Sequence, residues 1–461
     1  MAYQEWLSGK MGFSMRKAVN RFSSVMTPYI PAHLLVAASA WVSRIVTALI
    51  QIAIVRILLN SLGLENYAVF MLLTGLVGWF ALADMGIGVS VQNYISELRA
   101  ENQPYHALIA TGGMLAVLLL FGTVIALYFI SPHIAPLFLK QFSFLSDAEK
   151  TKLFFLTGAL SIGFGVGGII YKVWYAEQKG YLSNIVPAVA SGVGFIGLLL
   201  VRQAPVGDRL FLSLTVFMTP TAFLPLAALV RQQLMNGHQH YLGTEFFSTV
   251  LQIMKRGLRF WLFALMAAGV LQVDYIVMSQ FLDSHAITSY SISTKVFSFA
   301  FFIYSAILLA LWPIFAEHIA RRQWDAIRQY LKKYLIFGFA FMFVCTALLV
   351  WLMPVAVRVL APKENIVIPL GFILLLGAYQ MLRVWTDTFS TLLLSMNDLA
   401  PFWILVPLQA LISVGLQWIL APRFGIYGIV WGLIGSFVCT VTWGLPLAAR
   451  RNYRLGMREV A

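Results

Sequence analysis

Charged residues are scarce in this sequence. Asp, Glu, Lys and Arg make up 11% of its 461 residues, whereas 60% are hydrophobic. A soluble protein carries about 25% charged residues, so this composition excludes a soluble enzyme or a sizeable soluble domain. Apolar stretches of about 20 residues, the length that crosses a bilayer as a helix, recur along most of the chain. The sequence therefore predicts an all-α polytopic membrane protein.

Cysteine is almost absent as well, and with it several kinds of site. Cys345 and Cys439 both lie in apolar stretches, which excludes a disulfide framework or a thiolate metal site. No GxxxxGK[ST] loop occurs, so the chain carries no ATPase of its own. The seven histidines lie in loops or near span ends, among them His238 and His240 in NGHQHYLG. We expect no metal, no cofactor and no catalytic site: the chain is not an enzyme.

The net charge of +14 is spread over short loops rather than gathered in one patch, which argues against binding to nucleic acid. Lys and Arg favour the side of the membrane that holds the amino terminus, and the positive-inside rule then places both termini in the cytoplasm. Residues 1–33 are basic and weakly amphipathic, as expected of a segment on the membrane surface. The apolar run that follows is too long for a cleaved signal peptide.

Windows of about 19 residues predict twelve membrane spans. The sixth contains two prolines, which neighbouring helices can accommodate in a membrane. The predicted spans are 34–59, 67–93, 106–130, 152–173, 183–201, 210–230, 257–281, 289–315, 334–357, 366–395, 402–420 and 425–448.

The two halves of the chain resemble each other. SELRAENQPYHALI matches AEHIARRQWDAIRQ, so that Glu97 corresponds to Glu317, 220 positions later, and Pro187 stands 220 positions before Pro407. Two six-span halves with both termini on one side imply a parallel repeat, a common construction of transporters. We predict two six-helix lobes, residues 34–230 and 257–448, a cytoplasmic connector 231–256 and a basic cytoplasmic tail 449–461.

Seven charged side chains stand well inside the predicted spans. A charge at the bilayer centre costs about 2.5–3.5 kcal/mol on insertion scales, so such groups are paired or serve the function. Four are cations and three are carboxylates, which gives the spans a net positive charge. The seven are Arg44, Arg56, Asp84, Asp274, Lys295, Arg383 and Asp387.

Depth along the helix predicts which of these charges meet. At about 1.5 Å per residue, two acids fall level with a cation on a neighbouring span. A third acid is spaced i, i+4 from an arginine on its own helix. Arg56 has no matching acid and lies close enough to the outer face to snorkel there. The expected pairs are Arg44–Asp84, Asp274–Lys295 and Arg383–Asp387.

A basic, polar lining near the middle of the membrane suits an anionic substrate such as a phosphate or diphosphate. Arginine offers a planar fork to phosphate oxygens, whereas Lys295 offers a point charge. The paired acids would hold the cations when the site is empty, or titrate during transport. Several aromatic residues lie near span ends, as in interfacial belts: Trp174, Tyr175, Trp312, Trp324, Trp351 and Trp418. Trp79, Tyr304 and Trp385 lie deeper and could stack on sugar rings.

The stretch RILLNSLGLENYAVFMLLTGLVGWFALADMGIGVSVQNYISE has a short outer loop followed by a span that ends in D-x-G. In this it resembles the polysaccharide flippases of the O-antigen exporter type (Wzx-like), within the multidrug/oligosaccharidyl-lipid/polysaccharide exporter superfamily. The likeness continues in SYSISTKVFSF, WPIFAEHIARRQ and PRFGIYGIVWG and covers nearly the whole chain.

This resemblance implies a MATE-like V of two lobes, with a central cavity lined mainly by spans 1, 2, 7 and 8. It also implies a function: moving an undecaprenyl-diphosphate-linked oligosaccharide, an O-antigen or exopolysaccharide repeat unit, across the bacterial inner membrane. Transport would run from the cytoplasmic to the periplasmic leaflet by alternating access, coupled to H⁺ or Na⁺. The implied partners are the lipid-linked glycan, membrane lipids, and polysaccharide polymerase and chain-length proteins.

The resemblance also assigns roles to the membrane charges. Arg44, Arg56 and Lys295 would attract the diphosphate or an acidic sugar. Asp84 and Asp274 would be counter-charges or ion-coupling carboxylates. Arg383 and Asp387 are a further candidate cavity pair, although they fall outside the usual lining of such cavities.

Three other functions fit the sequence less well. A cation-coupled drug exporter of the MATE branch would want an acidic or aromatic cavity, whereas this one is mildly basic. A lipid II flippase has two additional spans that form a lipid groove. A polysaccharide polymerase or ligase needs a large periplasmic loop with catalytic Arg or His, and no predicted outer loop is long enough.

Overall fold

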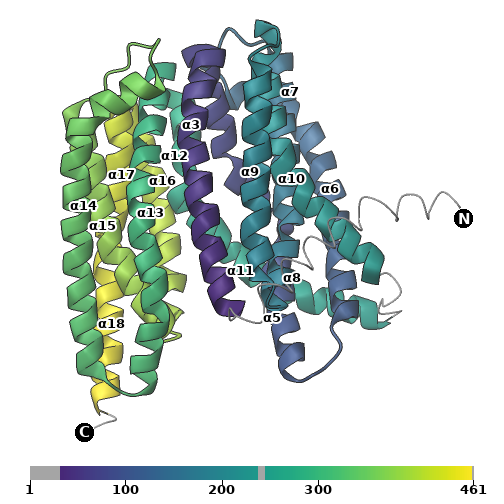
Figure 1. Cartoon of the computed structure of the whole chain (residues 1–461), viewed down its shortest axis with the longest axis vertical. Helices are drawn as coiled ribbons and strands as arrows, with labels where there is room; N and C mark the ends of the chain where they lie inside the picture. The colour runs from purple at the N-terminus through teal and green to yellow at the C-terminus, as the bar shows by residue number, and fades with distance from the viewer. Residues whose placement is uncertain (1–31, 237–243, 459–461) are drawn as a thin grey trace, which may run out of the picture.

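The computed structural model of the chain describes residues 32–236 and 244–458, and within these ranges it is helical with short connections and no strand (Figure 1). The predicted amphipathic segment, except for its last two residues, lies outside the described residues, as do His238 and His240. The elements in chain order are α3 (Ala32–Gly75), α4 (Val77–Ala81), η1 (Leu82–Asp84), α5 (Ile87–Ala100), α6 (His106–Phe138), α7 (Asp147–Gly167), α8 (Ile169–Ala176), α9 (Gly180–Val201), η2 (Val206–Asp208), α10 (Arg209–Asn236), α11 (Thr244–Leu271), α12 (Val273–Phe281), α13 (Ser284–Ala320), α14 (Trp324–Leu360), α15 (Leu370–Ser395), α16 (Ala400–Phe424), α17 (Ile426–Cys439) and α18 (Val441–Arg458).

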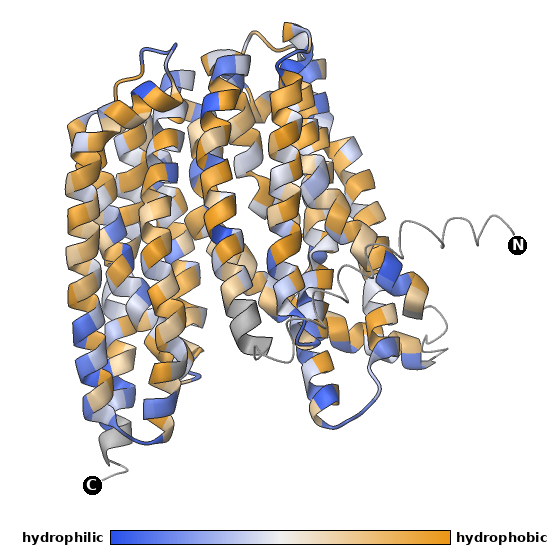
Figure 2. Cartoon of the chain, in the orientation of Figure 1, coloured by the Kyte–Doolittle hydropathy of each residue, from blue (hydrophilic) through white to orange (hydrophobic). Residues whose placement is uncertain are grey.

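Apolar helices long enough to cross a membrane make up most of the described chain. Nine helices in the described residues are long and apolar enough to cross a membrane. Helices α11 and α12 together make a tenth crossing, bent by 42° at the break between them. The long α3 holds two predicted spans, because its helix is broken at Gly63, where φ is 75°. The 26-residue α15 matches the tenth predicted span. The nine helices, the bent pair, the second part of α3 and α15 together account for the twelve predicted crossings within the described residues. Figure 2 shows that these helices are mostly apolar.

The second span ends earlier than the sequence predicted. Its helix stops at Asp84 rather than continuing to residue 93, because Met85 (φ 47°) and Gly86 (φ 74°) both adopt left-handed backbone. Gly86 is required at this position for a second reason as well, since a Cβ there would overlap the carbonyl oxygen of Gly257 on α11. The chain then restarts as a separate helix, α5, that packs against α8 and α11.

Polar contacts between side chains also join α11 to the end of the second span. Arg256 binds Glu97 through two hydrogen bonds, from Nη1 to Oε2 at 3.0 Å and from Nη2 to Oε1 at 2.7 Å. The guanidinium also lies 4.6 Å from the centre of the Tyr94 ring. Further along α11, the Trp261 indole N–H donates to the Leu82 carbonyl at 2.8 Å. The amino-terminal part of α11 is therefore bound to the first half of the chain.

The pair of Glu97 and Arg256 predicts a small pH dependence of stability. Hydrogen bonds from Arg256 lower the pKa of Glu97 from its usual 4.5. Because the folded-state pKa lies below the unfolded value, the stabilisation is present above about pH 4.5 and disappears as pH falls through the folded-state value. Both side chains are partly exposed, so Glu97→Gln should cost less than about 1 kcal/mol at pH 7.

Thermal unfolding of wild type and Glu97→Gln in detergent, at pH 7 and in steps down to pH 4, checks this expectation. The difference between the two proteins should shrink as the pH falls, and a constant difference would contradict it. Glu317→Gln is the matched control, since Glu317 forms a more exposed pair with Arg321 on a single helix.

The internal repeat reappears in the backbone hydrogen bonds that end the helices. Gln103 and Gln323, 220 positions apart, each donate an N–H to the carbonyl five residues earlier, at 2.8 and 2.9 Å, and each follows a residue with φ 55°. Lys179 and Asp398, 219 positions apart, repeat this geometry at 2.7 and 3.0 Å. These left-handed helix ends close the same crossings in the two halves. The parallel repeat predicted from the sequence is therefore confirmed.

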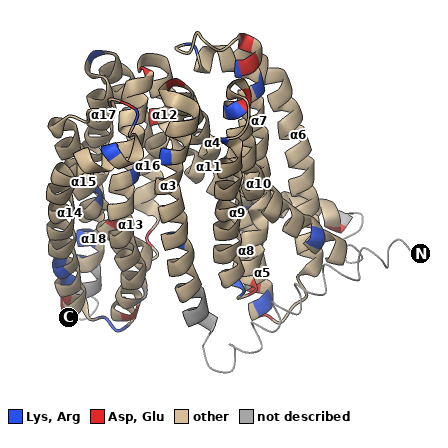
Figure 3. Cartoon of the chain, turned by 45° about the horizontal axis from the view of Figure 1, so that its top comes forward, with Lys and Arg blue, Asp and Glu red and all other residues tan. Residues whose placement is uncertain are grey.

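The helices form two groups in Figure 1, with α13–α18 on one side and α3–α10 on the other. Helix α3 of one group packs against α13 of the other, and α11 contacts α5 in one group and α16 in the other. The described ends of the chain, the start of α3 and the end of α18, lie at the same end of the bundle. Charged residues gather mainly at the helix ends (Figure 3). The boundaries of the two lobes, residues 34–230 and 257–448, and of the connector 231–256 stay predictions.

Candidate functional site

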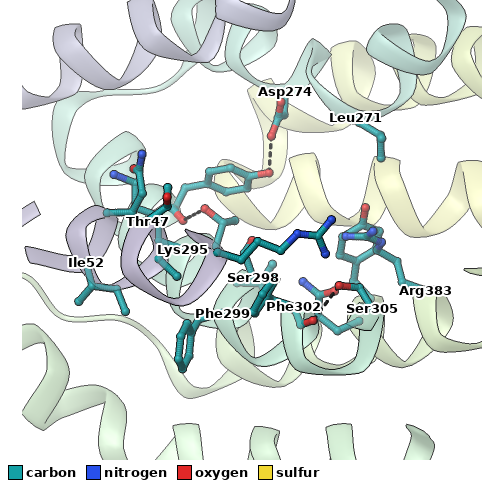
Figure 4. A pocket seen from close by; sticks show the side chains of 18 of the residues that line it. Thr47, Ile52, Leu271, Asp274, Lys295, Ser298, Phe299, Phe302, Ser305 and Arg383 are labelled. Carbon is teal, nitrogen blue, oxygen red and sulfur yellow. Dashed lines mark hydrogen bonds between the residues drawn. The ribbon is translucent and has the colours of Figure 1, made fainter. Parts of the chain in front are cut away.

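A cavity of about 870 Å³ lies between the two groups of helices (Figure 4). Its walls come from α3 and α9 on one side and from α12, α13 and α15 on the other, with single contributions from α11 and α17. This volume is within the range of about 300–1,000 Å³ that small-molecule sites occupy. The cavity therefore combines surfaces from both halves of the repeat.

Four of the seven membrane charges line this cavity. Arg44 comes from α3, Asp274 from α12, Lys295 from α13 and Arg383 from α15. Figure 4 shows three of them, Asp274, Lys295 and Arg383, around the same space. Three cations and one carboxylate leave the lining with a net positive charge.

The expected ion pair between Asp274 and Lys295 does not form, although both residues line the cavity. Asp274 instead accepts the Tyr290 hydroxyl at Oδ2 (2.6 Å) and the Tyr275 backbone N–H at Oδ1 (3.0 Å). It stands in the first turn of α12, whose amino terminus favours a negative charge. In the described part of the chain, the Lys295 ammonium has no hydrogen-bond or ion-pair partner. It is therefore available to a ligand.

The two arginines of the cavity are held differently. The guanidinium carbon of Arg44 lies 5.8 Å from the centre of the Phe302 ring, and Arg44 forms no ion pair with any residue that the structure describes. Arg383 forms the expected pair with Asp387, at 3.1 Å between Nη2 and Oδ2. The guanidinium carbon of Arg383 also lies 4.0 Å from the centre of the Phe301 ring.

Arg383 and Asp387 were a candidate cavity pair, although the family resemblance placed them outside the usual lining. Arg383 lines the cavity, whereas Asp387 is not among its lining residues. The spacing alone located the pair, but only the rotation of α15 within the bundle decides which of its faces meets the cavity.

Asp84 and Arg56 do not line the cavity. The Arg44–Asp84 ion pair was a wrong expectation, because counting depth assumed a straight second span and the helix is broken at Asp84. The Asp84 carboxylate accepts the backbone N–H of Gly86 at 3.0 Å. The positive charge of Lys172 on α8 attracts this carboxylate. The carboxylate thus satisfies backbone donors at the break before α5. Arg56 is exposed on α3 and is not among the cavity residues.

This local role of Asp84 can be tested with two substitutions. Asp84→Asn keeps an oxygen that can accept the Gly86 N–H, so we expect thermal unfolding of the purified protein close to wild type. Asp84→Ala removes the acceptor and should cost about 0.5–2 kcal/mol, as the loss of a helix cap does. Equal damage from both variants would show that the negative charge itself is required.

The three aromatic residues expected to stack on sugars, Trp79, Tyr304 and Trp385, do not line the cavity. Each donates a hydrogen bond to a backbone carbonyl instead: Trp79 to Gln272 at 3.3 Å, Tyr304 to Tyr334 at 3.3 Å and Trp385 to Thr442 at 2.9 Å. The aromatic residues that do line it are Tyr275, Tyr290, Phe299, Phe302 and Tyr379.

A sequence signal for part of this lining existed on α13. Thr294, Ser298, Phe302 and Ser305 recur at spacings of three or four residues, Lys295 stands next to Thr294, and all five line the cavity. These positions make one stripe of a helix. Reading that stripe outward from Lys295 would have identified Phe302.

Contacts also join the two halves at the end of the bundle that lies away from the described chain ends. The Tyr67 hydroxyl is 3.2 Å from the Ser291 hydroxyl, and both residues are buried. Gln141 donates to the Gln280 carbonyl at 2.8 Å, and Gln280 donates to the Leu137 carbonyl at 3.1 Å. The lining extends in the other direction along the starts of α3 and α9, toward the end that holds the termini.

Comparison with known proteins identifies the family. The MatE family model matches residues 261–419. A protein of Yersinia pseudotuberculosis that is named for O-antigen export is 38% identical over 426 residues, which cover 91% of this chain and 96% of that protein. This chain belongs to the O-antigen exporter family. As a member of that family it is a multi-pass membrane transport protein, not an enzyme.

Solved structures of other membrane transporters share the fold of this O-antigen exporter family member. The lipid II flippase MurJ, in an inward closed conformation, has a TM-score of 0.71 at 13% identity and covers 90% of this chain and 87% of its own. An inward-facing MATE multidrug transporter has a TM-score of 0.67 at 16% identity, with 90% and 96% covered. At these identities the likeness concerns the fold alone.

Proposed function

We propose that this exporter moves an undecaprenyl-diphosphate-linked oligosaccharide, an O-antigen or exopolysaccharide repeat unit, from the cytoplasmic to the periplasmic leaflet of the inner membrane. The observation that carries the proposal is the group of three cations and one carboxylate in a cavity between the two halves. Arg44 and Arg383 offer planar donor forks to diphosphate oxygens, and Lys295 adds a point charge. A relative named for O-antigen export supports the glycan as cargo.

The packing between the halves supports transport by alternating access. With both termini in the cytoplasm, as the distribution of Lys and Arg favours, the structure would be an inward-facing state. Its outer side is closed by the Tyr67–Ser291 and Gln141–Gln280 contacts. Opening toward the periplasm would break these contacts and bring the inner ends of α3 and α13 together.

Coupling to H⁺ or Na⁺ would use Asp274 in this proposal. It is the carboxylate among the cavity-lining residues, and its oxygens are held by a hydroxyl and a backbone N–H rather than by a cation. An arriving proton or sodium ion would therefore not have to displace Lys295. Delivery at the periplasmic leaflet would hand the glycan to polysaccharide polymerase and chain-length proteins.

The basic cavity also argues against the export of cationic drugs, because like charges repel. Arg44, Lys295 and Arg383 would outweigh Asp274 for any organic cation that entered. The described residues contain twelve crossings and lack the two further spans expected of a lipid II flippase, which argues against that alternative.

A deletion strain tests the proposal. Cells that lack this chain should lose surface polysaccharide and accumulate the lipid-linked glycan in the inner membrane, and the wild-type gene should restore both. Gel analysis of surface polysaccharide and mass spectrometry of extracted lipids give the two readouts. Normal surface polysaccharide in the deletion strain would overturn the proposal, whereas efflux of a cationic dye should not change.

A further inference from the structure

A second cavity, of about 320 Å³, opens beside the first and lies within the first half of the chain. We call it the side chamber. It shares Gln51, Tyr275 and Lys295 with the main cavity, so the two spaces meet at these residues. Its remaining walls come from α3, α4, α7 and α10. These walls are formed by Ile54, Phe70, Met71, Thr74, Gly75, Val77, Ser161, Phe164, Phe217, Met218 and Thr221.

The hydroxyl groups of the side chamber are arranged to accept hydrogen bonds. Thr74 donates its hydroxyl hydrogen to the Phe70 carbonyl at 2.8 Å, and Thr221 donates to the Met218 carbonyl at 2.7 Å. A hydroxyl has one hydrogen and two lone pairs. Since each hydrogen is used within its own helix, both half-buried threonines present acceptor lone pairs to a ligand that donates.

The rest of the chamber adds aromatic surface and no acid or arginine. Phe164 and Phe217 line it as half-buried rings. At the junction with the main cavity, the Gln51 amide has no hydrogen-bond partner among the described residues and can both donate and accept. Lys295 is the charged member of this lining.

This chemistry differs from that of the main cavity. A diphosphate accepts hydrogen bonds and needs cations or N–H donors, which Arg44 and Arg383 supply outside the chamber. A sugar ring donates from its hydroxyls and presents an apolar face to aromatic rings. Away from Gln51 and Lys295 at the junction, the chamber offers hydroxyl acceptors and the half-buried rings of Phe164 and Phe217 beside the buried Phe70. It therefore suits a neutral sugar better than a phosphate.

We propose that the side chamber is a sugar subsite. One sugar of the glycan lies between Phe164 and Phe217 and donates hydroxyl hydrogens to Thr74 and Thr221, while the diphosphate stays in the main cavity. Lys295 stands at the junction of the two. This inference rests on the proposed function and adds to it a division of the substrate between two spaces.

Binding measurements with two lipids test the subsite. The probes are undecaprenyl diphosphate without sugar and the lipid-linked glycan extracted from cells that lack this chain. Their binding to purified full-length protein in nanodiscs is measured for wild type and for the double variant Thr74→Val/Thr221→Val, which keeps side-chain shape and removes both acceptors. We expect the variant to bind the glycan-linked lipid roughly tenfold more weakly, as loss of two hydrogen bonds implies, and the sugar-free lipid unchanged.

Thr123→Val is the matched control. Thr123 on α6 also donates its hydroxyl to a carbonyl of its own helix, that of Leu119, and lines neither cavity. It should bind both lipids like wild type. Equal binding of the glycan-linked lipid by wild type and the double variant would overturn the sugar subsite, and so would an equal loss for both lipids. Failure of wild type to bind either lipid would instead overturn the proposed function.

Discussion

Arg44→Ala should abolish surface polysaccharide, whereas Arg56→Ala should leave it near the wild-type level. The two arginines lie on the same helix, 12 positions apart, but only Arg44 lines the cavity. Each hydrogen bond between a guanidinium and a phosphate is worth about 1.5–3 kcal/mol. Loss of a bidentate contact therefore reduces substrate binding by about a hundredfold or more. Complementation of the deletion strain, with gel analysis of surface polysaccharide, gives the measurement.

Membrane levels of both variants must be compared by immunoblot, so that loss of export is separated from loss of protein. Arg44→Lys should recover part of the export, because it restores the charge without the planar fork. Full export by Arg44→Ala would remove this residue from the substrate site. Full loss in Arg56→Ala at normal protein level would show that the exposed arginine acts outside the cavity.

Gly86→Ala should greatly reduce the amount of folded protein. The left-handed backbone at Gly86 costs a non-glycine residue about 1–2 kcal/mol, and the added Cβ would overlap the Gly257 carbonyl. Overpacking of this kind adds about 1–3 kcal/mol. Because backbone rather than a flexible side chain faces the new methyl group, α5 and α11 would have to move apart.

Thermal unfolding in detergent and membrane yield measure this loss. Gly122→Ala on α6 is the control, since a Cβ at Gly122 meets nothing within 4 Å and its backbone is helical. It should be neutral or slightly stabilising, as alanine is the better helix former. An unchanged unfolding temperature for Gly86→Ala would contradict the close approach of the two helices.

Predictions made within one helix and predictions made between helices had different outcomes. Arg383 and Asp387 pair as expected, because the i, i+4 spacing brings them together in any α-helix. Arg44 and Asp84 do not pair, because their expected contact required an unbroken second span. Two left-handed residues after Asp84 end that span, and only one of them, Gly86, is a glycine, so the break left little sign in the sequence.

Composition and repetition by themselves determined the class of this protein. Sparse charge, twelve apolar stretches and a period of 220 residues predict a polytopic helical transporter with two related halves, since backbone in lipid must be hydrogen-bonded within helices. The identities of most cavity charges were also readable, because unpaired charge is costly in a membrane.

Tertiary structure alone decided how those charges are used. The rotation of α15 turns Arg383 into the cavity, and the placement of α13 beside α12 brings the Tyr290 hydroxyl to Asp274. The break at Asp84 removes that acid from the site. Helix rotation and bending depend on packing between segments far apart in the sequence, for example Gly86 against Gly257. Periodicity along one segment carries no information about such contacts.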